Sequence, residues 1–230
     1  MSLTSEVLGV LQGRTVAEIN FRFPLRGSDS RQIAITPMAF NLVALAISGG
    51  RITVQPSFPP PGQGGWYVAT ERSAWYNYVA GTNTLEIPDD AQYGGNWIDG
   101  GKIVHVCLHA YYDITRFGID ANAEEASAYV CEEMYYALNP FTVPRKTGPI
   151  SGIARQVALD LCKRDLQQRI LNQNVARVFH RPVEQSEILE VDEDDWYALR
   201  ASIGTHPSYA KLPANALRGI IQGEQSLHDG

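Results

Sequence analysis

Two histidines lie four residues apart in a segment whose apolar residues repeat at helical spacing. His105 and His109 should therefore occupy the same face of one helix, and Asp113 continues that face. Val104 and Leu108 lie on the opposite side and should pack against the rest of the protein. Two imidazoles and a carboxylate on one side of a helix form a platform suited to a metal ion.

A zinc ion usually needs a third protein ligand, and the next segment supplies a candidate. A second helix is predicted from about Glu124 to Leu138, after a short loop around Gly118. Glu125 starts one stripe of this helix, which continues through Tyr129, Glu132 and Tyr136. An antiparallel helix pair with so short a connection should bring Glu125 back beside the two histidines.

These motifs resemble a bacterial group of gluzincin-type zinc metallopeptidases. HVCLHAYYD followed by EEASAYVCEEMY is similar to that group's pattern, which reads HExxHAxxD and then E-A-x-A-Y on the following helix. NTLEIP and GKIVH resemble its lead-in, so the similarity covers about residues 75–138. The resemblance implies that His105, His109 and Glu125 bind zinc. It also implies that Asp113 holds the second ring nitrogen of a histidine.

One departure from the pattern affects the expected chemistry. The residue after the first histidine, where the family has its catalytic glutamate, is Val106. In HExxH enzymes this glutamate takes a proton from the metal-bound water. Valine cannot transfer protons, and general acid–base catalysis is worth about 10²–10⁴-fold in rate. We therefore expect a pseudoenzyme that keeps its zinc and binds a peptide or protein partner across the same cleft.

Several alternatives remain open at the level of sequence. The base could be relocated to Glu124, Glu132 or Asp113, which would leave an active zinc hydrolase. The two histidines could instead be metal-free helix residues capped by Asp113 and Glu125, in an interaction or structural protein. Iron bound by two histidines and one carboxylate is a further option. A di-iron helical bundle is disfavoured because no Glu-x-x-His occurs in the chain.

Composition limits the class of protein. Apolar residues make up 44% of the 230 residues and charged residues 19%, which is enough for a sizeable core. A net charge of −6 argues against a nucleic acid or an anionic membrane as the main partner. The three cysteines lack C-x-x-C spacing and should be reduced. No secretory signal or membrane-spanning run is visible, so a cytoplasmic location is expected.

The pattern along the chain predicts an α+β fold, mainly helical, in a single domain over residues 1–230. Helices are expected at 3–11, 37–48, 101–116, 124–138, 151–177, 196–203 and 214–221, and strands at 14–23 and 51–55. A hairpin should turn near 80–83, and the resemblance implies that it lies beside the histidine helix. By the resemblance, Trp75, Tyr76 and Tyr129 would line a peptide cleft. Ordinary aromatic packing in a small sheet is the alternative.

Overall fold

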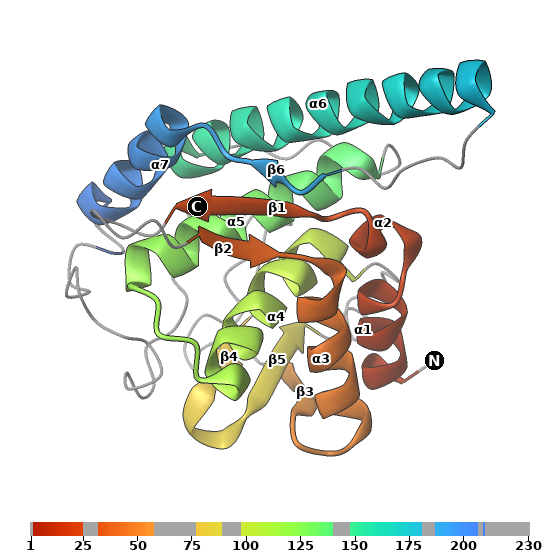
Figure 1. Cartoon of the computed structure of the whole chain (residues 1–230). Helices are drawn as coiled ribbons and strands as arrows, with labels where there is room; N and C mark the ends of the chain where they lie inside the picture. The colour runs from red at the N-terminus through yellow and green to blue at the C-terminus, as the bar shows by residue number, and fades with distance from the viewer. Residues whose placement is uncertain are drawn as a thin grey trace.

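The computed structural model describes residues 2–24, 32–57, 77–88, 98–139, 148–180, 187–206 and 209. Figure 1 shows two central helices with small sheets beside them and a long helix across one side. The helices are α1 (Leu3–Leu11), α2 (Arg14–Ala17), α3 (Pro37–Ser48), α4 (Gly100–Thr115), α5 (Ala121–Leu138), α6 (Pro149–Phe179) and α7 (Glu193–Thr205). The strands are β1 (Phe21–Pro24), β2 (Gln32–Ile35), β3 (Thr53–Ser57), β4 (Asn77–Val79), β5 (Thr84–Pro88) and β6 (Leu189–Glu190).

Both sheets of the described chain are small and mixed, which confirms the predicted helical α+β class. In one, β1 pairs antiparallel with β2 and parallel with β6. In the other, the strand order is β3-β5-β4, and β4 and β5 form the predicted antiparallel hairpin through the single turn η2 (Ala80–Thr82). Because β4 contacts α4, the hairpin lies beside the histidine helix as expected.

The strand predicted over residues 14–23 is shorter than expected. Arg14–Ala17 forms the short helix α2 and places Val16 in the core, so only Phe21–Pro24 is extended. Within residues 14–23, β1 is the part that combines an extended backbone with alternating burial, since Phe21 and Phe23 are buried and Arg22 is exposed. The packing of Val16 in the core therefore favours a helix at residues 14–17 over the extended strand that the sequence pattern predicts.

Helix α4 is more buried than its sequence pattern predicts. Every residue from Gly100 to Ala110 is buried, on the histidine side as well as on the apolar side. The histidine side is buried because α5 packs onto it and brings its own acidic side chains to the histidines. A helix that is buried all round is a central core element, and polar groups within it need partners.

Two glycines let the first turn of α4 lie against α5. A Cβ atom added at Gly101 would be 2.3 Å from Cζ of Tyr136, and one added at Gly100 would be 2.2 Å from the hydroxyl of Tyr135. Tyr136 is held in place because its hydroxyl donates to Asp99, the N-cap residue of α4, at 2.8 Å. The glycine pair is therefore part of the α4–α5 interface.

Gly101→Ala should lower the free energy of unfolding by about 1–3 kcal/mol, the usual cost of overpacking a tight contact. Urea denaturation followed by circular dichroism measures this change. Gly9→Ala is the matched control: Gly9 lies inside α1 with nothing within 4 Å of an added Cβ, so the same substitution should stabilise by up to about 1 kcal/mol. Equal stability of Gly101→Ala and wild type would contradict the close approach.

The C-terminal elements pack over α5 and the first sheet. Phe23 of β1 stacks on the buried Trp196 of α7 with ring centroids 4.3 Å apart. Arg200 of α7 donates to both carboxylate oxygens of Asp120, the N-cap residue of α5, at 2.9 and 2.8 Å. In this way α7 fixes the start of the helix that carries Glu125.

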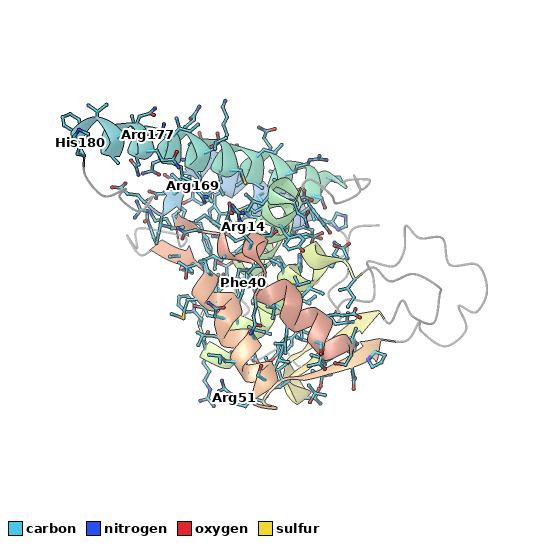
Figure 2. The ribbon with its side chains drawn as sticks, turned by 90° about the vertical axis from the view of Figure 1, so that its right-hand side faces the viewer. Arg14, Phe40, Arg51, Arg169, Arg177 and His180 are labelled. Carbon is cyan, nitrogen blue, oxygen red and sulfur yellow. The ribbon has the colours of Figure 1, made fainter. Side chains whose placement is uncertain are left out.

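The long helix α6 packs on α5 and α7. Arg169 contacts Glu18 of the segment after α2 at 3.3 Å, and Figure 2 shows Arg169, Arg177 and His180 following one another toward the helix end. None of the helices in the described parts of the chain combines the length and apolar character needed to cross a membrane.

Candidate metal centre

Helix α4 presents its two histidines side by side. Asp99 caps the helix by accepting hydrogen bonds from the backbone N–H groups of Gly101 and Lys102, and this fixes the first turn. One turn separates His105 from His109, and their ring centroids are 5.1 Å apart. His105 has no exposed surface and His109 is only 5% exposed. The pair therefore lies inside the protein.

Helix α5 directs one acidic and aromatic stripe at α4. The carboxylate of Glu125 faces both histidines. The ring of Tyr129 packs edge-on against the ring of His105. The carboxylate of Glu132 contacts His105 and Lys102. These three residues follow the i, i+4, i+7 spacing of one helix face. The sequence predicted this stripe, and the structure places it against the histidine side of α4.

Three donor groups converge on one point. Nε2 of His105 is 3.5 Å from Oε2 of Glu125, and Nε2 of His109 is 3.6 Å from Oε1. Ligand atoms of all three residues lie within 4.8 Å of one another. The sequence therefore predicted correctly that Glu125 returns beside the histidine pair.

The donor set and its spacing fit a divalent ion. Separations of 3.5 and 3.6 Å exceed a normal hydrogen bond, which spans about 2.7–3.2 Å. They are close to the roughly 3.3 Å that separates two ligand atoms of a tetrahedral zinc with bonds of about 2.0–2.1 Å. Two imidazoles and one carboxylate are also a common protein ligand set for zinc. The described residues thus form a buried His/His/Glu cluster that could hold a metal ion.

Comparison of the chain with known proteins gives no relative. No protein-family model, curated protein or solved structure matches it. The structure shows the His/His/Glu cluster, and the gluzincin-type resemblance is an interpretation of the sequence motifs. The identity of the metal likewise rests on ligand chemistry.

Two further glutamates contact the histidines from the other side. Oε1 of Glu124 is 2.6 Å from Nδ1 of His109, and Oε2 of Glu132 is 2.9 Å from Nδ1 of His105. A carboxylate at Nδ1 holds the proton there and leaves Nε2 available as a ligand atom. Both rings are therefore oriented with Nε2 toward Glu125, as metal-binding histidines require.

Asp113 lies elsewhere than the resemblance implies. Its carboxylate accepts a hydrogen bond of 2.7 Å from the hydroxyl of Tyr78 on β4, and it thereby attaches the hairpin to α4. Burial and this contact with Asp113 raise the pKa of Tyr78, so the phenol stays a donor. In this structure the carboxylates at the histidine Nδ1 atoms are those of Glu124 and Glu132, which sequence analysis had weighed only as replacement bases.

A buried lysine completes the cluster. Nζ of Lys102 is 2.8 Å from Oε1 of Glu132, and both side chains are almost fully buried. Burial by itself raises the pKa of Glu132, but Lys102 and His105 more than offset it and hold the pKa well below its ordinary value. Burial lowers the pKa of His105, and the carboxylates of Glu125 and Glu132 reverse this and raise it. Excess negative charge thus surrounds His105 when no ion is bound.

The other predicted site residues have separate positions. Val106 has no exposed surface and belongs to the hydrophobic core cluster. Tyr129 is also fully buried, so its side chain does not line an exposed cleft in this structure. Trp75 and Tyr76, the other two residues assigned to a cleft, lie outside the described residues.

Sequence analysis missed Tyr209, which follows α7. Its hydroxyl is 3.0 Å from that of Tyr129, whose ring lies edge-on to His105 at a centroid distance of 4.8 Å. Tyr209 is only 2% exposed. No local pattern marks this residue, because its partner is 80 positions earlier in the chain.

Proposed function

We propose that the chain is a metallopeptidase-like protein that binds one divalent ion, zinc, through His105, His109 and Glu125. The convergence of these three donors carries the proposal, because their separations suit a shared ion. Glu124 and Glu132 support it by orienting both imidazoles. When bound, zinc polarises a carbonyl oxygen and lowers the pKa of its bound water.

The surroundings favour a binding function over hydrolysis. Val106 occupies the position of the peptidase base and cannot move a proton. The three carboxylates that could replace it are engaged: Glu124 with His109, Glu132 with His105 and Lys102, and Asp113 with Tyr78. Glu124 and Glu132 also lie at the Nδ1 atoms, on the side of each ring away from Glu125. We therefore infer a pseudoenzyme rather than a peptidase with a relocated base.

The partner that we propose is an extended peptide or a protein segment. Among the described strands, β4 is at one edge of the β3-β5-β4 sheet, and the Tyr78–Asp113 hydrogen bond joins it to the helix that carries both histidines. An exposed sheet edge can bind an extended segment through backbone hydrogen bonds. The resemblance to gluzincin-type domains implies the same arrangement of strand edge and motif helix.

Zinc titration with a chromophoric competitor tests the metal site. The untagged wild-type protein should bind one zinc ion per chain, and Glu125→Gln should weaken binding by at least 10²-fold because it removes a ligand charge. Glu124→Gln should cost about 10–100-fold through loss of the Nδ1 carboxylate. Asp113→Asn is the matched control and should change zinc affinity less than about threefold, since Asp113 contacts Tyr78 instead.

A peptide-library assay tests the pseudoenzyme part of the proposal. The zinc-loaded wild-type protein should cleave no peptide above background. Cleavage that disappears in His109→Ala would show an active hydrolase and overturn it. A folded wild-type protein that binds no divalent ion would overturn the metal site and leave a metal-free interaction protein.

A further inference from the structure

Tyr209 reaches the proposed zinc site from outside the helices. It follows α7, which ends at Thr205, and it is only 2% exposed. Its hydroxyl is 3.0 Å from the hydroxyl of Tyr129, and the ring of Tyr129 packs edge-on against His105 with centroids 4.8 Å apart. A hydrogen bond and a ring contact therefore connect Tyr209 with a proposed zinc ligand.

A turn of the chain attaches Tyr209 to the end of α7. The backbone N–H of Tyr209 donates to the carbonyl of His206 at 2.9 Å, and the centroids of the two rings are 5.9 Å apart. The helix before this turn is fixed independently, because Arg200 donates to the carboxylate of Asp120 at the start of α5. Tyr209 can therefore move away from Tyr129 through changes in the backbone after Thr205, without displacing α7.

Opening the site between α4 and α5 would require these two helices to separate. They carry all three proposed ligands, and buried side-chain contacts join them. Nζ of Lys102 is 2.8 Å from Oε1 of Glu132, and the hydroxyls of Tyr112 and Ser127 are 2.9 Å apart. Breaking several such contacts together costs more than breaking one hydrogen bond and exposing one tyrosine ring. Among the described elements, the segment after α7 thus opens at a lower cost than the helix pair.

We propose that the hydroxyl pair of Tyr129 and Tyr209 is a latch, which keeps the segment after α7 closed over the metal centre. When the latch opens, the ring of Tyr129 can turn away from His105, and an ion or a small solute enters. The inference rests on the proposed zinc site and adds how that site is reached. A latch that closes alike over an empty and a filled site sets the rates of entry and release and leaves the affinity unchanged.

Histidine modification measures the opening without any metal. Diethyl pyrocarbonate acylates imidazole nitrogens that solvent reaches, and peptide mapping by mass spectrometry gives a rate for each histidine. In the zinc-free full-length chain, Tyr209→Phe should raise the rate at His105 and His109 about fivefold, because loss of one buried hydrogen bond increases the open population by that factor. The exposed His180 is the internal reference. Tyr197→Phe, at a 40% exposed tyrosine of α7, is the matched control and should leave the rates unchanged.

A double-mutant cycle tests whether the two hydroxyls act on each other. Tyr129→Phe should also speed the modification of His105. The double variant should fall below the product of the two single effects, since both substitutions remove the same hydrogen bond. Equality with that product would show that the hydroxyls act through separate contacts and would overturn the latch.

Zinc release separates the latch from a role in positioning His105. When the zinc-loaded chain is mixed with an excess of a chromophoric chelator, Tyr209→Phe should release zinc about fivefold faster than wild type. Its equilibrium affinity for zinc should stay within about twofold of wild type. A residue that only positions His105 would instead weaken the affinity.

The outcomes distinguish the latch from the zinc site. If wild type binds one zinc, and Tyr209→Phe has wild-type rates of modification and release, the latch is overturned and the zinc site stands. Weaker zinc affinity without faster modification also overturns the latch. If wild type binds no zinc, the zinc site is overturned, and the modification rates of the zinc-free chain still decide whether the latch controls access to His105.

Discussion

Saturating zinc should raise the unfolding midpoint of the wild-type chain by about 10 °C. An ion that binds only the folded state stabilises it by about 4 kcal/mol when its free concentration is a thousand times its dissociation constant. For a chain of this length each kcal/mol shifts the midpoint by about 2–4 °C. The effect should be large because the zinc-free protein buries the carboxylates of Glu124, Glu125 and Glu132 around the two histidines, and a bound cation offsets their charge.

Differential scanning calorimetry with and without zinc measures this shift. Glu125→Gln should show almost none of it, since the variant lacks the carboxylate that faces both Nε2 atoms. Calcium should leave the wild-type midpoint unchanged, because it prefers sites made of six to eight oxygen ligands. A zinc shift of equal size in wild type and Glu125→Gln would place the ion elsewhere and contradict the site.

Val106→Glu should create peptidase activity in the zinc-loaded protein toward peptides that enter when this part of the protein opens, at a rate up to about 10²–10⁴-fold above the wild-type background. Position 106 is about 100° around α4 from His105 and about 60° from His109, so its side chain flanks the face that carries both ligands. A glutamate there restores the HExxH arrangement, in which the carboxylate takes a proton from metal-bound water. Val106 is fully buried, so the variant should also lose some stability.

Val106→Gln is the matched control for that experiment. Glutamine has nearly the same size and polarity as glutamate but cannot accept the proton, so it should remain at the wild-type rate. Zinc content must be equal in the three proteins, and cleavage of a fluorogenic peptide library gives the rates. If Val106→Glu is folded, zinc-loaded and inactive, the missing base alone does not explain the absence of hydrolysis.

The local parts of the site could be predicted from sequence. Helical spacing places His105 and His109 on one face, and the short connection to α5 returns Glu125 to them. The same spacing placed Tyr129 and Glu132 on the stripe of Glu125, although it did not assign their contacts. Each of these positions depends on one helix or on one helix pair, where geometry is set by residues close in the chain.

The remaining features depend on tertiary contacts that spacing does not show. Asp113 lies on the histidine face, yet its carboxylate accepts a hydrogen bond from Tyr78 of β4. The carboxylates next to the histidine Nδ1 atoms are those of Glu124 and Glu132. The burial of residues 100–110 of α4 on all sides follows from α5 covering the polar face of the helix. Tyr209 reaches Tyr129 across 80 residues, a contact that no local pattern could indicate.

The near-complete burial of the ligands determines when an ion can enter. His105 and Glu125 have no exposed surface, and the Tyr129–Tyr209 hydroxyl pair lies next to His105. Uptake or release therefore requires this part of the protein to open, and local opening is slow compared with diffusion of an ion. The metal content of a purified sample should consequently reflect the medium in which the chain folded.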